Sequence, residues 1–181
     1  MIFGDGIRLR AIERSDLPRF VAWLNDPEVR MGLAIYQPLS QAQEENWYEN
    51  TLKLPAQEQP LVIEIEIPQG WTAIGNLGLT NLDWHNRSAE VGIFIGAKQY
   101  WNQGYGRKAM ELLLAHAFAA MNLYRIYLRV HETNARAVHS YEKAGFQHEG
   151  RMRSAHFNNG RYIDVLLMSV LQPDWNARRS T

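Results

Sequence analysis

The chain has 181 residues, no cysteine, and equal totals of 19 basic and 19 acidic side chains, so its formal net charge is zero. This length suits one globular domain, and the lack of cysteine excludes disulfides, thiolate zinc sites, iron–sulfur clusters and a thiol nucleophile. Zero net charge argues against bulk electrostatic binding to nucleic acids or anionic membranes.

The first half of the chain predicts a strand, two helices and three further strands. Alternation in Ile7-Arg8-Leu9-Arg10 predicts the first strand. A helix begins at Ser15-Asp16 and ends near Asn25, because the following Asp26-Pro27 disfavours helical geometry. The second helix begins at Ser40, where Gln43 completes a capping box. Runs of β-branched and aliphatic residues then predict strands at 61–67, 73–79 and 88–95.

The second half predicts a long helix, a strand, a shorter helix and a hairpin. Apolar side chains between residues 106 and 121 fall at helical spacing and form one stripe. A strand follows at 123–130, and Asn134 and Gly145 mark the ends of the next helix. The hairpin comprises 146–157 and 162–170, turned by Asn158-Asn159-Gly160. We therefore expect a mixed α/β sheet with helices on its faces, in one domain over residues 1–181.

The chain shows no segment for membrane insertion or secretion. The most apolar run, Leu112 to Met121, contains His116 and is only ten residues long. A run of this length is too short to span a bilayer. The amino terminus lacks the basic-then-apolar pattern of a signal peptide. We therefore expect a cytoplasmic protein that binds neither membrane nor nucleic acid.

The zero net charge hides an asymmetry between the two halves. Residues 1–90 carry 7 basic and 13 acidic side chains, whereas residues 91–181 carry 12 and 6. An acidic half and a basic half suit a protein that brings a cationic substrate to an anionic cofactor. Uneven surface charge without a function is the alternative.

The strongest local signal is the segment Trp101-Asn102-Gln103-Gly104-Tyr105-Gly106-Arg107-Lys108, between a predicted strand and the long helix. The two glycines let the chain turn with several N–H groups on one side, and the helix terminus adds a partial positive charge. The segment therefore predicts a phosphate cradle, with a simple connecting loop as the alternative.

A dinucleotide-binding fold is the other interpretation of these glycines. Gly104, Gly106 and Ala109 match G-x-G-x-x-A, and Glu132 ends the next strand. However, eight residues separate Ile95 from Gly104, and too few residues follow to complete a doubly wound sheet. The dinucleotide-binding fold is therefore much less favoured than a phosphate cradle of another fold.

The segment from Asn134 to Phe146 resembles the GNAT family of acyl-CoA-dependent N-acetyltransferases. In that family a glycine-rich loop is followed by Asn-x-x-Ala-x-x-x-Tyr-x-x-x-Gly-Phe, as at Asn134, Ala137, Tyr141, Gly145 and Phe146. The resemblance covers nearly the whole chain and is strongest to the branch that acetylates ribosomal-protein amino termini, with polyamine acetyltransferases as close relatives. It implies a GNAT-like fold, a mostly antiparallel sheet of about seven strands flanked by about four helices, with acetyl-CoA as co-substrate.

The resemblance also implies a coenzyme A site built largely from backbone groups. The strand end would pair with the pantetheine arm, the glycine loop would hold the pyrophosphate, and Tyr141 would point toward the sulfur. The residues implied at the cofactor are Ile93, Phe94, Ile95, Asn102, Gln103, Gly104, Tyr105, Gly106, Arg107, Asn134, Ala137 and Tyr141. Trp101 stands where the family often has Gln or Arg, and an indole contributes no charge there.

Two residues are candidates for proton transfer. Glu90, at the start of the cofactor strand, could accept the proton of the amine, or it could be a structural carboxylate. Tyr141 could protonate the departing thiolate or hydrogen-bond to its sulfur. Because tyrosine has a higher reference pKa than a thiol, full transfer requires a lowered pKa of Tyr141. Packing in the core is the alternative for this ring.

The acceptor is expected to be an amine, either a protein amino terminus or a small molecule. Glu28, Glu44 and Trp84 are the candidate substrate residues. Polyamine enzymes of the family tend to carry acidic residues where this chain has Tyr36-Gln37-Pro38, which disfavours a polyamine. The six histidines show no zinc-binding spacing, so no metal is expected. A non-catalytic acyl-CoA-binding module is the competing hypothesis, and a homodimer is considered because dimers are common among relatives.

Overall fold

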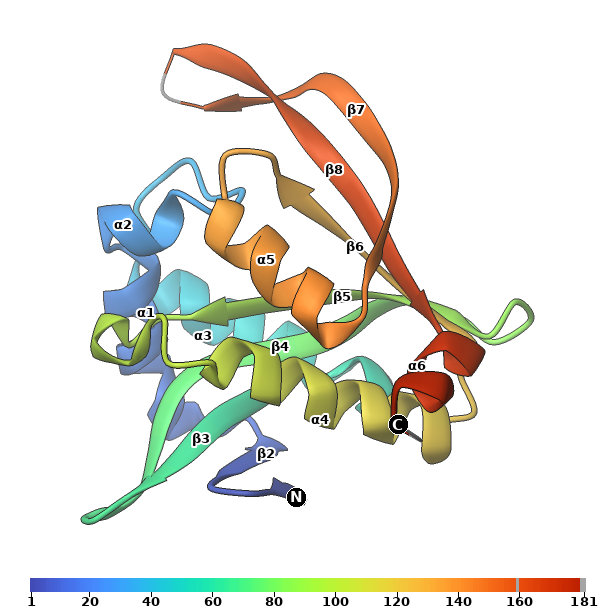
Figure 1. Cartoon of the computed structure of the whole chain (residues 1–181). Coiled ribbons are helices and arrows are strands. Elements are labelled where there is room, and N and C mark those ends of the chain that lie inside the picture. Colours follow the sequence, from blue (N-terminus) through green and yellow to red (C-terminus); the bar gives the residue numbers. More distant parts are fainter. Residues whose placement is uncertain (159, 180–181) are drawn as a thin grey trace. The chain divides into compact units, whose positions relative to one another are not determined.

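The computed structural model describes residues 1–158 and 160–179 of the chain (Figure 1). They form two compact units, each of which is described by itself. The first unit comprises Met1–Leu79 and Gly92–Leu112. The second comprises Thr80–Val91 and the described residues from Leu113 onward.

Eight strands make up the sheet, in the order β1-β2-β3-β4-β5-β6-β8-β7. Neighbours β5 and β6 are parallel, whereas β1–β2, β2–β3, β3–β4, β6–β8 and β7–β8 are antiparallel. The mixed, mostly antiparallel fold is therefore confirmed, and it differs from a doubly wound parallel sheet. The strands are β1 (Ile2–Gly4), β2 (Ile7–Ala11), β3 (Leu61–Ile67), β4 (Gly70–Asp83), β5 (Ser88–Ile95), β6 (Arg125–His131), β7 (Gln147–Asn158) and β8 (Arg161–Leu171).

The first strand, β1, was not expected from the sequence. Its three residues are too few for an alternating pattern, and it is joined to β2 by a turn in which Gly6 has a φ of 67°. Position 6 therefore favours glycine, because residues with a Cβ rarely adopt the left-handed backbone conformation. This hairpin accounts for the eighth strand.

Three helices of the first unit precede β3: α1 (Leu17–Leu24), α2 (Pro27–Arg30) and α3 (Gln41–Thr51). The predicted end of α1 at Asn25 is confirmed, and Asp26 then caps the one-turn helix α2 by accepting from the N–H of Glu28 at 2.9 Å. The predicted capping box of α3 is also confirmed. The N–H of Gln43 donates to Ser40 at 3.2 Å, and its side chain accepts from the N–H of Ser40 at 2.8 Å.

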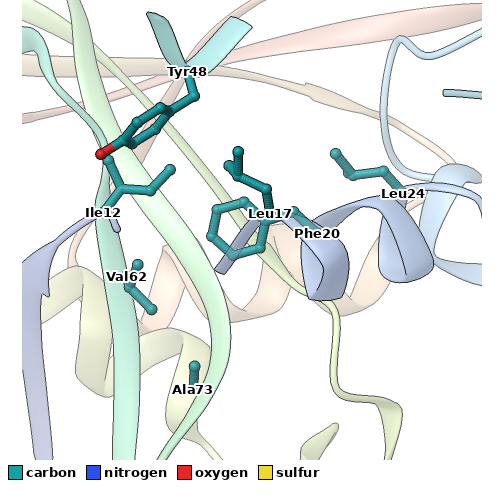
Figure 2. Close-up of a cluster of buried hydrophobic side chains, with 7 residues drawn as sticks. All are labelled: Ile12, Leu17, Phe20, Leu24, Tyr48, Val62 and Ala73. Carbon is teal, nitrogen blue, oxygen red and sulfur yellow. The ribbon is translucent and has the colours of Figure 1, made fainter. Parts of the chain in front are cut away.

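An apolar cluster joins these helices to the strands of the first unit (Figure 2). Figure 2 shows that the side chains come from α1, from α3, from strands β3 and β4, and from Ile12 just after β2. Burial of these side chains is the main favourable contribution to packing α1 and α3 onto the sheet. The members of the cluster are Ile12, Leu17, Phe20, Leu24, Tyr48, Val62 and Ala73.

The remaining helices are α4 (Tyr105–Ala119), α5 (Ala135–Ala144) and α6 (Gln172–Arg179). The expected bounds of α5 are confirmed: Asn134 caps its start, and Gly145 ends it with a φ of 105°. Within residues 1–158 and 160–179, helix α6 and the one-turn α2 are present in addition to the four helices expected. In the predicted hairpin turn, Asn159 lies outside the described residues. No helix in the part of the chain that the structure describes is long and apolar enough to cross a membrane.

Candidate active site

The glycine loop of the first unit connects β5 to α4. The N–H groups of Gly96 and Ala97 both donate to the carbonyl of Ile74, at 2.9 and 3.1 Å. The chain then makes one 3₁₀ turn over Lys98–Tyr100. Asn102 and Gly104 have left-handed backbone, with φ values of 61° and 83°. These two residues lie just before α4 begins at Tyr105.

The first turn of α4 provides N–H donors for an anion. Its first intrahelical hydrogen bond runs from the N–H of Lys108 to the carbonyl of Gly104, at 3.0 Å. The N–H groups of Tyr105, Gly106 and Arg107 precede that bond and belong to the helix positions that lack an intrahelical acceptor. The guanidinium of Arg107 lies 3.7 Å from Glu111 and adds positive charge to the same turn. This arrangement fits a pyrophosphate.

Residue Trp101 has a role in this loop that the sequence did not reveal. Its indole Nε1–H donates to the carbonyl of Ile95, the last residue of β5, at 2.8 Å. The side chain of Gln103 donates to the carbonyl of Gln99, at 2.7 Å. These two hydrogen bonds hold the connection between β5 and α4 in one conformation.

Strand β5 is paired with β6 over only part of its length. The pairing joins Ser88–Glu90 to Arg125–Tyr127 and does not reach Ile93, Phe94 or Ile95. The family resemblance implies that those three residues bind the pantetheine arm, which a strand edge can do through its backbone groups. The side chain of Phe94 makes edge contacts with Phe20 and Trp23, at centroid distances of 6.2 and 6.3 Å.

The two candidate substrate carboxylates of the first unit lie in different environments. Glu28 is exposed, and it accepts from the ammonium of Lys98, at 3.2 Å. Lys98 also pairs with Asp26, at 2.7 Å. Glu44, in contrast, is only 5% exposed and shares the buried face of α3 with Tyr48. Burial raises the pKa of Glu44.

In the second unit, the carboxylate of Glu90 is held by two neighbours. The guanidinium of Arg129 donates to both of its oxygens, at 2.8 and 3.1 Å. The side-chain amide of Asn81 donates to Oε2, at 2.9 Å. Oε1 therefore accepts one of these hydrogen bonds and Oε2 accepts two, which orients the carboxylate.

The motif from Asn134 to Phe146 spans α5, from the residue that caps its start to the two residues that follow its end. Burial raises the pKa of Tyr141 to about 12, so the phenol stays protonated and can act as a hydrogen-bond donor. The side-chain oxygen of Asn134 accepts from the N–H of Ala137, at 3.2 Å, and caps the helix. The amide nitrogen of Asn134 does not take part in this cap and could donate a hydrogen bond to a cofactor.

Trp84 lies in the turn that precedes β5, whereas the glycine loop follows β5. It is 54% exposed, and the turn is held by Asp83, which accepts from the N–H and the side chain of Asn86 at 2.8 and 2.6 Å. Among the described residues, no group of three or more His, Cys, Asp or Glu could hold a metal ion.

Two charged partners in these sites were missed by sequence reasoning. Arg129 lies 39 residues from Glu90, and Lys98 lies 70 residues from Glu28. Opposite charges on predicted neighbouring strands could have suggested the first pair. The second depends on the path of the loop and leaves no signal in the sequence.

Comparisons with known proteins identify the family. The family model described as acetyltransferase (GNAT) domain matches residues 7–147. A spermidine N(1)-acetyltransferase of Vibrio cholerae is 35% identical over 95% of this chain and 96% of its own length. A putative ribosomal N-acetyltransferase of Bacillus subtilis is 25% identical over 97% of this chain and 96% of its own length.

Solved structures agree with this result. The crystal structure of spermidine N-acetyltransferase from Vibrio cholerae in complex with CoA and spermine has a TM-score of 0.86 at 32% identity, and it covers 96% of this chain and 99% of that chain. A dodecameric structure of that enzyme has a TM-score of 0.80 at 32% identity, with coverage of 97% and 99%. The chain therefore belongs to the GNAT acetyltransferases and is an N-acetyltransferase that uses acetyl-CoA.

Proposed function

We propose that this enzyme acetylates a polyamine of the spermidine or spermine type by direct transfer from acetyl-CoA. The observation that carries the proposal is the similarity, over nearly the full length of both chains, to a spermidine N(1)-acetyltransferase. The ribosomal N-acetyltransferase is less similar, at 25% identity, so a protein amino terminus is the weaker candidate. This reverses the preference that Tyr36-Gln37-Pro38 gave at the level of the sequence.

The buried carboxylate of Glu44 supports a cationic substrate. An ionised carboxylate loses solvation when it is buried, and a nearby cation recovers much of that free energy. Polyamine nitrogens with lysine-like pKa values are ammonium groups at neutral pH. Glu44 could therefore bind one ammonium group of the substrate, in place of the acidic residues that are absent at positions 36–38.

The first unit offers the groups that acetyl-CoA requires. The N–H groups from Asn102 to Arg107 would hold the pyrophosphate, and the backbone of Ile93–Ile95 would pair with the pantetheine arm. Left-handed backbone at Asn102 and Gly104, and the donors at the start of α4, support this assignment. When bound, acetyl-CoA supplies the activated acetyl thioester.

In the second unit we assign Tyr141 as the hydrogen-bond donor to the cofactor sulfur. With a pKa of about 12, against a thiol reference near 8.5, complete proton transfer from tyrosine would be uphill by ~5 kcal/mol. Donation of a hydrogen bond avoids that cost. The ring of Tyr141 packs 5.9 Å from that of Phe146, which limits its orientation.

The contacts of Glu90 support a positioning role over that of general base. Both oxygens already accept hydrogen bonds, and protonation of Glu90 would remove the negative charge that faces Arg129. A lysine-like amine is neutral to only ~1 part in 2,500 at pH 7, so the reaction should accelerate as the pH rises toward the pKa of the amine. Without cysteine, a thiol-bound acetyl intermediate is excluded, which favours direct attack.

The test is an acceptor screen that measures release of free thiol. Because the chain has no cysteine, a thiol reagent detects only the coenzyme A that turnover produces. We expect thiol release with spermidine and spermine, and little with amino-terminal peptides or aminoglycosides. Turnover of a peptide but not of polyamines would refute the polyamine assignment. Light scattering on the same sample would show whether the enzyme assembles, as the dodecameric relative does.

A further inference from the structure

The connection between β5 and α4 is held by a tryptophan. Trp101 caps the 3₁₀ turn, and its backbone N–H donates to the carbonyl of Lys98, at 3.0 Å. Its partly buried side chain reaches back to the carbonyl of Ile95, at 2.8 Å. Both hydrogen bonds lie within the first unit, and together they close residues 95–101 into a compact loop.

The position of this hydrogen bond in the chain gives it a functional consequence. Ile95 ends the strand assigned to the pantetheine arm, and Trp101 immediately precedes the left-handed Asn102. The donors assigned to the pyrophosphate follow directly, at the start of α4. One side-chain hydrogen bond thus fixes the distance in space between the end of β5, assigned to the pantetheine arm, and the start of the loop assigned to the pyrophosphate.

Other contacts support the loop less directly. The rings of Tyr100 and Tyr105 meet edge to face at 6.0 Å, and the side chain of Gln103 donates to the carbonyl of Gln99. Neither contact reaches β5. The indole of Trp101, in contrast, joins the loop to the end of that strand by a hydrogen bond of 2.8 Å.

We propose that Trp101 is a positioning residue for the coenzyme, whose indole N–H orders the pyrophosphate loop against the end of β5 before acetyl-CoA binds. The side chain does this without charge and without touching the reacting atoms. Preordering lowers the entropy that the loop loses on binding. The inference rests on the proposed assignment of the pyrophosphate to this loop.

The test compares two acetyl donors in the variant Trp101→Phe, which keeps an aromatic ring but removes the N–H. Acetyl-CoA carries the pyrophosphate, and S-acetylpantetheine lacks it. We expect KM for acetyl-CoA to rise five- to tenfold, with kcat and the acceptor KM within twofold of wild type. Activity with S-acetylpantetheine should stay unchanged, because this donor does not use the loop.

Trp71→Phe is the matched control. This tryptophan belongs to the same unit, and its ring packs against the guanidinium of Arg8, at 4.4 Å, outside the loop. The control variant should keep the wild-type kcat and KM with both acetyl donors. If Trp101→Phe folds poorly, hydrogen exchange of the Trp101 indole N–H in the wild-type enzyme without acetyl-CoA replaces it: we expect strong protection, and exchange at the rate of a free indole would overturn the preordering.

The outcomes separate the inference from the function on which it rests. If wild-type enzyme shows no preference for acetyl-CoA over S-acetylpantetheine, the assignment of the pyrophosphate to the loop fails. If wild type shows the preference and Trp101→Phe retains it fully, the positioning role of Trp101 is overturned. An equal loss with both donors would also overturn it, because a general disturbance of β5 would then be responsible.

Discussion

The guanidinium of Arg129 donates to both carboxylate oxygens of Glu90, from Nε to Oε1 at 2.8 Å and from Nη2 to Oε2 at 3.1 Å. Loss of a true general base typically costs 10²- to 10⁴-fold in rate. Because Glu90 is already paired, we expect Glu90→Gln to lower kcat by less than about tenfold, measured at saturating substrate from pH 6 to 9. A loss above a hundredfold with a flattened pH profile would instead identify Glu90 as the base.

Tyr141→Phe removes the hydroxyl assigned to the cofactor sulfur while it keeps the packing of the ring. We expect kcat to fall by about 10²-fold, with KM for acetyl-CoA changed less than about threefold. Tyr162→Phe is the control, because that ring is exposed in the same unit. Equal effects of the two changes, or unchanged turnover in Tyr141→Phe, would contradict the assigned role.

The raised pKa of Tyr141 makes a prediction about alkaline pH. Burial disfavours the charged phenolate, so its pKa of about 12 lies above the ordinary value of 10.0. The hydrogen-bond donor is therefore present throughout the range from pH 6 to 10. We expect no alkaline decline in kcat below pH 10 that depends on Tyr141, which comparison of the pH profiles of wild type and Tyr141→Phe will check.

Glu44→Gln separates stability from substrate binding. The folded pKa of Glu44 lies above its ordinary value of 4.5, so its ionisation destabilises the fold as the pH rises through that folded pKa. We expect Glu44→Gln to unfold at the same or a higher temperature than wild type at pH 7.5, and the difference to vanish below pH 4. The same variant should raise KM for spermidine about tenfold, because the amide cannot pair with an ammonium group.

Local patterns predicted those elements whose ends are set by nearby residues. Ser40 with Gln43, and Asn134 with Gly145, define helix ends through contacts within a few residues, and both were read correctly. The three-residue β1 and the one-turn α2 were missed because such short elements show no period. Their stability comes from pairing and capping, not from a stripe of apolar residues.

The candidate site was predicted only as far as motifs specify it. The motif that contains Asn134 and Tyr141 indicated the family, but the partners that define local electrostatics come from distant segments. Arg129 reaches Glu90 only because β6 returns beside β5 after the long helix α4. The hydrogen bond from Trp101 to Ile95 depends on loop conformation, which no period or composition encodes.

A buried ion-pair network in the first unit predicts stability and its pH dependence. Arg10 donates twice to Asp16, both at 2.7 Å, and once to Glu64, at 2.7 Å, and both carboxylates are buried. Arg10→Met leaves them without this partner, so we expect the free energy of unfolding to fall by ~3 kcal/mol in urea titrations. Arg14→Met, which removes an exposed ion pair with Glu49, should lower the free energy of unfolding far less than Arg10→Met does.

The effect of Arg10 should fade in acid. Burial opposes the ionisation of Asp16, but hydrogen bonds from Arg10 and from the N–H of Glu13 hold its pKa below the ordinary 3.8. Stability from this group is thus present above pH 3.8 and is lost as the pH falls through the lower folded pKa. The unfolding curves of wild type and Arg10→Met should therefore converge below that pH, and a constant difference would contradict the assignment.

Gly96, immediately after β5, tests how closely α1 packs against the start of the coenzyme loop. A Cβ at this position would lie 2.2 Å from Cδ2 of Trp23, so the indole or the backbone must shift. We expect Gly96→Ala to lower the free energy of unfolding by about 2 kcal/mol and to raise KM for acetyl-CoA, because Gly96 donates to Ile74 and leads into the loop. Denaturant titrations and donor kinetics measure the two effects.

Gly92→Ala is the matched control for Gly96→Ala, because Gly92 lies on β5, just before Gly96, and its added Cβ would meet no atom within 4 Å. It should change stability by less than about 0.5 kcal/mol. Trp23→Leu, made alone and together with Gly96→Ala, completes the comparison. If the contact with Trp23 is the cause, the alanine costs less when the indole is absent, and the two changes are not additive. Additive changes would show that backbone geometry at Gly96, not the packing of Trp23, requires glycine.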